Sequence, residues 1–311
     1  MASGSILYLP SVRQSEWIPE LFPGRSPAEL PIAGRRIIDY QVEHAIKFGV
    51  SAAKIIDWRF SDRVARSFRD PQRTGYTVSY TRGEGEMPRG LRDLDGLSPL
   101  LAQSTTDGLY VVWGPCLCGH GPADARLEPV SEADVADTPM GLYRRVDGRW
   151  MRIKPGGLVV RGLKSWHRAN FSVLRDPGLF TLPCYSVEKD VHLGRNVVLE
   201  HGTSVVPPVL IKGNTWCARN VRLEGDVIVG SGSYIGEGAR LKRTVIGKDT
   251  YVGNGLDLRG KIVMGNRVID PETGVWTDVE EPGVAREMGG APSWFKSVVD
   301  FFRGHSHGRR A

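Results

Sequence analysis

Aliphatic residues recur every six positions along the second half of the chain, between Val187 and Met264. One step of five residues, from Leu241 to Ile246, interrupts the pattern before it resumes. A period of six fits neither a helix, at 3.6 residues, nor a simple strand, at two. It fits a repeating short strand and turn, with the recurring side chains stacked in one inner column. The column would consist of Val187, Leu193, Leu199, Val205, Ile211, Cys217, Leu223, Val229, Ile235, Leu241, Ile246, Val252, Leu258 and Met264.

Glycine often follows the column residue, as in Leu193-Gly194 and Ile235-Gly236, and is expected to take tight corners with positive φ. This repeat resembles the left-handed parallel β-helix of the hexapeptide-repeat proteins. That family contains sugar-nucleotide acyltransferases and the C-terminal domains of many sugar-1-phosphate nucleotidyltransferases. The resemblance implies this fold for residues 183–284, with residues 270–284 as an end cap, and a homo-oligomer formed through it. It leaves function open, because unrelated functions share one fold.

The first half of the chain alternates strand-like and helix-like segments. Ile6–Leu9 and Ala53–Asp57 are short apolar runs, and a helical pattern between them runs from Val42 to Val50, with Gly49 as its stop signal. Strand, helix and strand at this spacing predict an α/β unit with a parallel sheet. Residues 119–139, rich in Gly, Ala, Pro and Asp, are predicted to form a loop.

Three segments of this half carry a second resemblance. Leu30–Tyr40, with the sequence Leu-Pro-Ile-Ala-Gly-Arg-Arg-Ile-Ile-Asp-Tyr, resembles the Pro-Lys-Pro-Leu-Leu-Pro-Ile-Ala-Gly-Lys-Pro-Leu-Ile-Asp-Tyr segment of sugar-1-phosphate nucleotidyltransferases. Asp107–Gly114 resembles the strand before the Gly-Asp metal site of that family, and Ser165–Leu174 resembles its linker helix. The resemblance implies a trimmed Rossmann-like nucleotidyltransferase domain in residues 1–163 and a linker helix in residues 164–182, followed by the β-helix.

The chain departs from that family where the chemistry would take place. The Gly-x-Gly-Thr-Arg loop of the family cradles phosphate with backbone N–H groups, but Pro10–Trp17 contains no glycine. Pro27 stands where the family has a lysine, and Pro115 where it has the aspartate that holds Mg²⁺. In that family the loop positions the phosphates, the lysine neutralises their charge and the aspartate holds the metal ion. The resemblance therefore implies a catalytically degenerate member, which acts as a binding, regulatory or scaffold component in sugar-nucleotide or envelope polysaccharide metabolism.

An active NDP-sugar pyrophosphorylase remains an alternative, with a nucleotide or sugar nucleotide as its ligand. The nearest acidic residues to Gly114, Asp107 and Asp124, are displaced from the metal position of the family. We expect no metal site and no cofactor. The candidate residues for phosphate or nucleotide binding are Ser11, Arg13, Arg25 and Gly114.

A hexapeptide-repeat acyltransferase is a further alternative. Its general base would be His192 or His201, because the ordinary pKa of histidine suits that task. No protruding loop of the kind that builds an acyl-donor cleft interrupts the repeat between Val187 and Gly236. Both histidines are therefore predicted to face outward on a coil.

The composition of the 311 residues excludes few of these candidate functions. The net charge of +6 is mild, and the chain has no Lys/Arg block, so nucleic acid is not an expected partner. Cys116-Leu-Cys118-Gly-His120 has no second ligand pair, which argues against zinc. Four cysteines, no signal peptide and no apolar run of about 20 residues favour a cytoplasmic protein.

The last segment, residues 285–311, has a different character. Trp294, Phe295, Val298, Val299 and Phe302 fall at helical spacing on one side, and several basic residues and histidines follow. The pattern predicts an amphipathic helix from Trp294 to Phe302. This helix would either dock on the protein or lie on a membrane surface or membrane protein, which would make the protein peripheral to the membrane.

Overall fold

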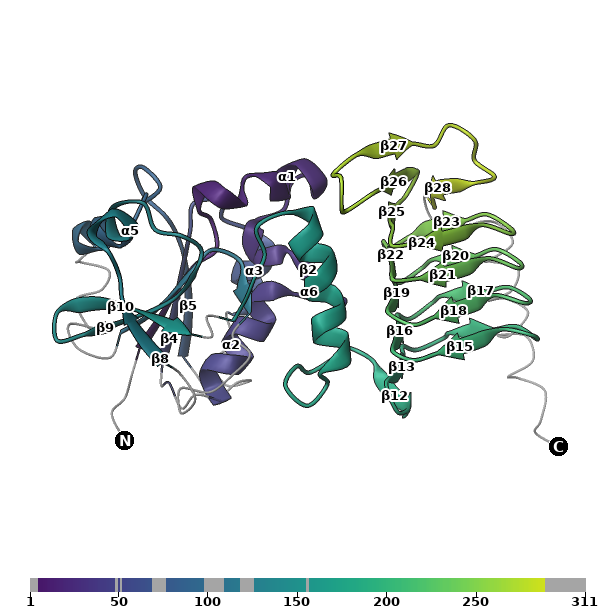
Figure 1. Ribbon diagram of the computed structural model, residues 1–311, viewed down its shortest axis with the longest axis horizontal. Helices are drawn as coiled ribbons and strands as arrows, with labels where there is room; N and C mark the ends of the chain where they lie inside the picture. Colours follow the sequence, from purple (N-terminus) through teal and green to yellow (C-terminus); the bar gives the residue numbers. More distant parts are fainter. Residues whose placement is uncertain are drawn as a thin grey trace. The chain divides into compact units, whose positions relative to one another are not determined.

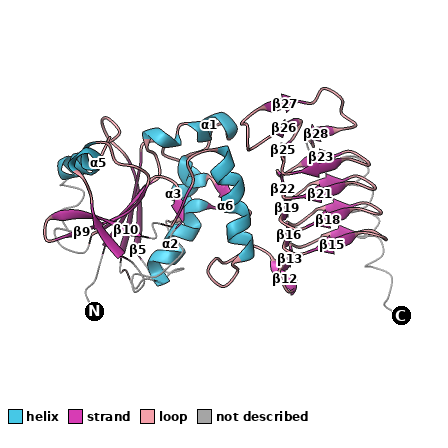
Figure 2. Ribbon diagram, viewed as in Figure 1, coloured by secondary structure: helices cyan, strands magenta, loops and turns pink. Residues whose placement is uncertain are grey.

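The computed structural model describes residues 5–47, 50, 52–68, 77–97, 109–117, 126–154 and 157–288. The chain divides into two compact units, residues 1–169 and 170–311 (Figure 1). Within the described residues, helices occur only before residue 176, and strands, bends and turns make up the rest (Figure 2). The predicted Trp294–Phe302 helix, Cys118, His120, Asp107 and Asp124 lie outside the described residues.

A seven-stranded mixed sheet forms the core of the first unit, in the order β5-β4-β1-β6-β9-β10-β8. The first four strands in that order are parallel, as predicted, and β9, β10 and β8 extend the sheet in antiparallel fashion. The bounds are β1 Ser5–Leu9, β4 Ala52–Asp57, β5 Thr77–Arg82, β6 Tyr110–Trp113, β8 Arg126–Pro129, β9 Gly141–Val146 and β10 Arg149–Lys154. Two short ladders accompany it, β2 Pro31–Ile32 with β3 Arg35–Arg36, and β7 Cys116–Leu117 with β11 Leu158–Val159.

Alternating residues of β1 enter two different cores, because successive strand side chains point to opposite faces. Ile6 and Tyr8 belong to one apolar cluster, which also contains Ile38 and Val42 of helix α2. Leu7 and Leu9 belong to the cluster on the other face. The helices are α1 Trp17–Leu21, α2 Ile37–Lys47, α3 Asp62–Ser67, α5 Glu132–Ala136 and α6 Leu163–Arg175, with 3-10 turns at Arg13–Ser15, Pro27–Glu29 and Leu91–Leu97.

The prediction of a loop over residues 119–139 is wrong for its second half. Strand β8 pairs with β10 there, and α5 follows. The Oγ atom of Ser131 accepts a hydrogen bond from the Asp134 backbone N–H at 3.1 Å and caps the helix. Ser131 thus starts a helix by satisfying one of the free N–H groups of the first turn.

The predicted linker helix is shorter than expected. Helix α6 ends at Arg175 rather than near residue 182, and the boundary between the two units falls inside it. Asp176 and Pro177 follow, and a residue before proline is driven away from helical geometry. No helix among the described residues has the length and apolar character that crossing a membrane requires.

The second unit consists of short strands in three sheets, which the chain visits in turn. From β13 to β25, neighbouring strands within a sheet lie one coil apart and pair in parallel, as Val191 does with Val209 and Val209 with Val227. We call residues 191–264 the coil stack (Figure 1). Its parallel strands are compatible with a β-helix. The sheet orders are β12-β13-β16-β19-β22-β25-β26-β27, β14-β17-β20-β23-β28 and β15-β18-β21-β24.

The strands of this unit are mostly two or three residues long. Their bounds are β12 Tyr185–Glu188, β13 Val191–Leu193, β14 Val198–Leu199, β15 Ser204–Val206, β16 Val209–Ile211, β17 Trp216–Cys217, β18 Arg222–Glu224, β19 Val227–Val229, β20 Tyr234–Ile235, β21 Arg240–Lys242, β22 Thr244–Ile246, β23 Thr250–Val252, β24 Asp257–Arg259, β25 Ile262–Met264, β26 Arg267–Ile269, β27 Trp276–Asp278 and β28 Ala285–Glu287. The last three strands are antiparallel and extend two of the sheets at the end of the stack, where the end cap was expected.

The predicted inner column is buried through the middle of the stack, from Ile211 to Val252. The prediction is wrong at both ends. Val187 is 54% exposed, because it lies in the antiparallel strand β12. At the other end Val263, not Met264, stands opposite Ile246, so a second step of five residues separates it from Leu258.

Most glycines after the column residues have a different role from the one predicted, although Gly265 does have a positive φ of 59°. Gly194 and Gly236 do not have positive φ, whereas Asn196 and Asn214 do, at 56° and 59°. Short polar side chains tolerate that conformation. A Cβ atom on Gly194 would lie 2.3 Å from the backbone nitrogen of Gly213 in the next coil. Glycine is therefore required there for close approach of consecutive coils.

Candidate functional site

The carboxyl edge of the parallel strands is the first candidate site. Strand β1 lies between β4 and β6, so the chain leaves it toward one side of the sheet and later returns on the other. Open α/β sheets bind ligands at such a switch point, outside the carboxyl ends of the strands. Here that point lies between the residues that follow β1 and those that follow β6, including the candidates Ser11 and Gly114.

Apolar side chains fill the space at Gly114. Its φ is +77°, and its N–H donates to the Leu9 carbonyl at 2.9 Å. A Cβ atom at this position would lie 2.8 Å from Met140 Cγ and 3.0 Å from Val12 Cγ2. Val12 and Met140 are each 1% exposed. The side chains of Val12 and Met140 therefore occupy the space into which a side chain at position 114 would point.

Asp57, the last residue of β4, collects the polar groups of this edge. Its side chain is fully buried. Oδ1 accepts hydrogen bonds from the Ser11 hydroxyl and, at 3.0 Å, from the Arg59 backbone N–H. Oδ2 accepts from the Ser26 hydroxyl and, at 2.7 Å, from the Tyr80 hydroxyl. We call Asp57, Ser11, Ser26 and Tyr80 the Asp57 network.

The Asp57 network ties four segments of the first unit to one carboxylate. Burial, and then the negative charge of Asp57, raise the pKa of Tyr80 far above its ordinary value, so its hydroxyl remains a donor. Each oxygen of the carboxylate has two donors, which compensates the cost of burying the charge. The Ser11 hydroxyl, predicted to bind phosphate, is committed to this network.

Arg13 and Arg25, the two predicted phosphate ligands, lie on the loops that the network anchors. Arg13 is exposed on the 3-10 turn after β1, and Arg25 is half-buried beside Ser26. The backbone N–H of Arg25 donates to the Phe22 carbonyl at 3.2 Å. Both arginines thus lie on loops at the carboxyl edge of the sheet. The hydroxyls of the nearby Ser11 and Ser26 donate to Asp57.

Sequence reasoning missed Asp57, Ser26 and Tyr80. The one signal in the sequence was Asp57 itself, a carboxylate at the last position of the predicted buried strand Ala53–Asp57. No group of three His, Cys, Asp or Glu side chains suited to a metal ion occurs among the residues that the structure describes. Cys116 is buried in β7 rather than in a loop, and Cys217 is buried in the stack, as predicted.

The two histidines proposed as general bases have different surroundings. His201 is exposed on the turn after β14. His192 in β13 is only 5% exposed, so the prediction of an outward, solvent-facing side chain is wrong for it. Its Nε2 atom is buried without a hydrogen-bond partner, and burial lowers its pKa although the charge of Asp190 opposes that effect. The imidazole is therefore held neutral and away from solvent.

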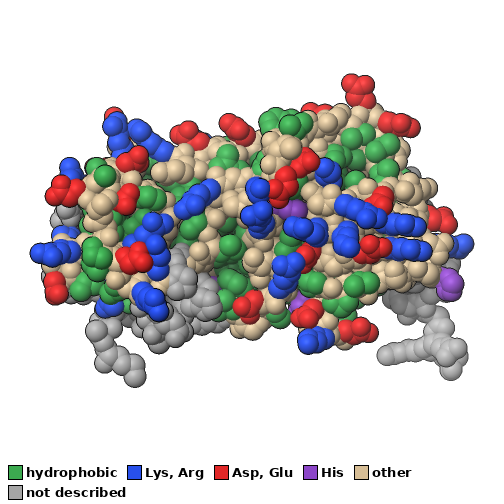
Figure 3. Space-filling model, viewed as in Figure 1, with side chains coloured by type: hydrophobic (Ala, Val, Ile, Leu, Met, Phe, Trp, Pro, Cys, Tyr) green, Lys and Arg blue, Asp and Glu red, His purple; other side chains and the backbone are tan. Residues whose placement is uncertain are grey.

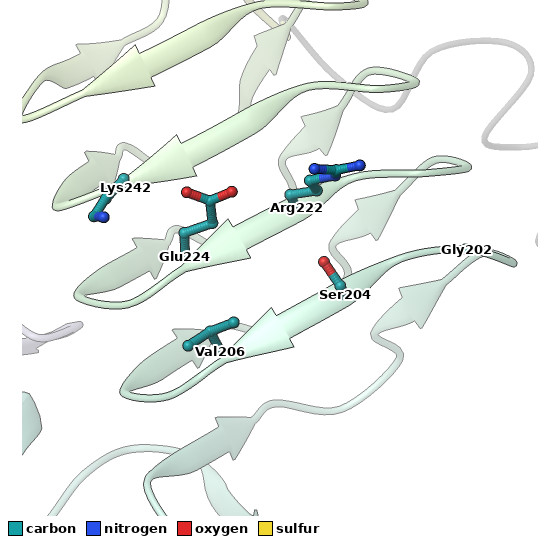
Figure 4. Close-up of a pocket in the computed structure, with 6 residues that line it drawn as sticks. All are labelled: Gly202, Ser204, Val206, Arg222, Glu224 and Lys242. Atoms are coloured by element: carbon teal, nitrogen blue, oxygen red, sulfur yellow. The ribbon is translucent and has the colours of Figure 1, made fainter.

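A hollow on the outer face of the coil stack is the second candidate site. It has a volume of about 490 Å³ and lies on the sheet formed by β15, β18 and β21. Figure 4 shows short side chains on β15 beside longer charged ones on β18 and β21. The lining residues are Gly202, Ser204, Val206, Arg222, Glu224 and Lys242.

Charged side chains line this sheet in register. Arg222 of β18 stands opposite Arg240 of β21, and Lys242 stands opposite Arg259 of β24. Figure 3 shows Lys and Arg side chains gathered over these strands, with a few carboxylates between them. Asp257 binds Arg259 through two hydrogen bonds of 2.9 Å, and this bond lowers the pKa of Asp257. The face is basic overall, with acidic groups interspersed.

The sequence matches no protein-family profile and no curated protein. The site must therefore be interpreted from its own geometry.

Proposed function

We propose that this protein is a non-catalytic relative of the sugar-1-phosphate nucleotidyltransferases, with a trimmed Rossmann-like first unit and a left-handed β-helix as its second. It would serve as a binding, regulatory or scaffold component of sugar-nucleotide or envelope polysaccharide metabolism, at the cytoplasmic side of the membrane. The six-residue period supports the left-handed form, and the Leu30–Tyr40 segment supports the family.

One observation carries the non-catalytic part of the proposal. The carboxyl edge of the parallel sheet is occupied by the chain itself, because Val12 and Met140 fill the space at Gly114 and the Ser11 hydroxyl donates to Asp57. Phosphoryl-type transfer depends on positioned backbone donors and cations around the phosphates. Here the donors nearest the switch point already have partners.

Thermal unfolding and pyrophosphate release test the proposal on the full chain. A ligand at 100 times its Kd adds about 2.7 kcal/mol to the free energy of unfolding, which is a measurable rise in Tm. We expect no Mg²⁺-dependent rise with any nucleoside triphosphate and no pyrophosphate release with sugar 1-phosphates. A Mg²⁺-dependent rise together with pyrophosphate release would overturn it and favour an active pyrophosphorylase.

A further inference from the structure

Two sheets of the coil stack have outer faces of different character. Strands β18, β21 and β24 carry charged side chains at their outward positions, such as Arg222 and Arg240. Strands β14, β17, β20 and β23 contain no charged residue. Successive strand side chains point to opposite faces, so the residue before each inner-column residue faces outward. We call these outward residues the aromatic row, which consists of Val198, Trp216, Tyr234 and Tyr251 in register.

The aromatic row forms a continuous ridge across four strands. The rings of Tyr234 and Tyr251 stack with their centroids 5.4 Å apart and their planes 6° apart. The Cζ atom of Arg286 lies 4.9 Å from the centroid of the Tyr251 ring. All four side chains of the row are half-buried. The row is therefore an ordered, mostly apolar surface that suits an apolar partner.

The corner beside the row carries charges of both signs. The Nε atom of Arg219 lies 3.7 Å from an oxygen of Glu200, and Glu237 is exposed. Burial first, and then the charges of Tyr251, Glu200 and Glu237, raise the pKa of Tyr234. Because acidic and basic groups alternate at this border, apolar contact along the row is the feature that selects a partner.

The described chain ends beside the row. Strand β28 pairs with β23 at the end of the stack and places Arg286 opposite Tyr251 (Figure 1). The backbone N–H of Met288 donates to the carbonyl of Asp249 at 2.6 Å. Residues 289–293 separate Met288 from Trp294 and reach about 20 Å at most when fully extended. The segment that begins at Trp294 therefore has to start close to this end of the stack.

The segment from Trp294 to Phe302 matches the row in length and character. Its apolar residues fall at helical spacing, and a helix of these nine residues is about 14 Å long. From Tyr251 to Val198 the row crosses three strand spacings of about 4.8 Å each, which is also about 14 Å. One apolar side of such a helix is thus long enough to cover the whole row.

We propose that the Trp294–Phe302 segment docks as a helix on the aromatic row of its own chain. The short connection from Met288 gives it an effective concentration of about millimolar at the row. That concentration favours its own chain over a second copy in dilute solution. The proposal concerns the coil stack and does not rest on the proposed function, so either can fail without the other.

Hydroxyl-radical footprinting of the full chain tests the docking. Mass spectrometry compares the oxidation of Trp216 and Tyr234 in the wild type with that in the triple variant Phe295→Ser/Val298→Ser/Phe302→Ser. We expect oxidation of both residues to rise by about twofold or more in the variant, because a segment that is docked most of the time shields what lies beneath it. The substitutions leave every residue of the stack unchanged, and an unchanged Tm of the main transition checks that the fold persists.

Two controls and a reciprocal variant sharpen the test. Ser297→Asn changes a polar position of the same segment and should leave oxidation unchanged. Tyr185, which is 60% exposed on β12, should be oxidised equally in every protein. In the reciprocal experiment, Tyr234→Ser should speed tryptic cleavage after Lys296 and Arg303, whereas the matched Tyr185→Ser should not.

Three results would overturn the proposal. The first is equal oxidation of Trp216 and Tyr234 in the wild type and the triple variant. The second is protection that disappears on dilution while light scattering shows a dimer becoming a monomer, which would favour a second copy as the occupant. The third is equal oxidation together with cosedimentation of the wild type with phosphatidylglycerol vesicles, which would favour a membrane surface as the partner of the segment.

Discussion

The carboxyl edge of the mixed sheet and the outer face of the coil stack use polar residues in opposite ways. In the Asp57 network every strong acceptor has a donor within the chain, and the carboxylate is buried. On the stack face, charged side chains of both signs stand exposed on neighbouring strands, with Arg222 opposite Arg240 and Arg240 opposite Asp257. The first arrangement satisfies buried polar groups within the fold, whereas the second keeps its charges in contact with solvent.

The difference cautions against assigning function by fold position alone. The switch point of an α/β sheet is the usual ligand site, yet here it is filled by Val12 and Met140. A regular stack of strands is usually regarded as a scaffold, yet its outer face carries exposed charged side chains in register. Four variants test this contrast.

The largest effect is expected at Asp57. The Asp57→Ala variant removes the acceptor of four hydrogen bonds and leaves buried donors on Ser11 and Ser26 and a half-buried donor on Tyr80. Each unsatisfied buried group costs about 1–3 kcal/mol, so the free energy of unfolding should fall by about 3 kcal/mol or more. Chemical denaturation measures it, with the exposed Asp62→Ala as control. A change below about 1 kcal/mol would mean that water replaces the network and that the edge is open.

Gly114→Ala tests whether the switch point is filled. The new methyl group meets Met140 and Val12, and the residue must also keep its positive φ of +77°. We expect a loss of about 2–3 kcal/mol in the free energy of unfolding, from backbone strain and overpacking together. Gly85→Ala is the matched control, since its φ is +69° and nothing lies within 4 Å of the new Cβ. Equal losses in the two variants would contradict tight packing at Gly114.

His192→Leu tests a buried polar group of the stack that, unlike Asp57, lacks a partner. Burial lowers the pKa of His192 in the folded protein, so the folded state disfavours the proton. Stability should be full above the unfolded pKa of about 6.5 and should fall as pH decreases through it.

The leucine variant should lose less stability than the wild type between about pH 7.5 and about pH 5.5, as measured by urea unfolding at both values. It should also gain about 1 kcal/mol at neutral pH, because an unsatisfied buried nitrogen is removed. A parallel decline of both proteins with falling pH would show that the imidazole is hydrated.

The smallest effect is expected at Arg222. Arg222→Gln removes one of two opposed like charges and should raise the free energy of unfolding by about 0.3 kcal/mol. The gain should shrink at high salt, because exposed charges are screened. A loss of stability at low salt would show that Arg222 has a favourable partner and that the charge is not available.

Sequence patterns predicted the elements better than the contacts between them. The six-residue period gave the inner column from Ile211 to Val252, since each coil repeats the same local geometry. It failed at Met264, where a turn at Gly260 with φ of +62° shortens the step. The Asp57 network lay beyond reach, because its side chains are 23 to 46 residues apart.

The cations of the stack face could have been found from sequence. Arg222 and Arg240 are one coil apart, as are Glu224 and Lys242, so a search for charge at the coil period would have aligned them. The aliphatic period by itself reveals only the inner column. The sequence placed Ser11 and Gly114 correctly at the ends of two strands. It could not show that the Ser11 hydroxyl donates to Asp57 or that Val12 and Met140 pack against Gly114.

Hydrogen exchange of the full chain, measured with and without a nucleoside triphosphate and Mg²⁺, tests most directly whether the carboxyl edge of the sheet is closed to ligands. With nucleoside triphosphate and Mg²⁺, peptides that contain residues 5–17, 24–30 and 109–117 should exchange as in the free protein. Protection of those three segments by the nucleotide would contradict the account, because it would show that the carboxyl edge of the sheet still binds a ligand.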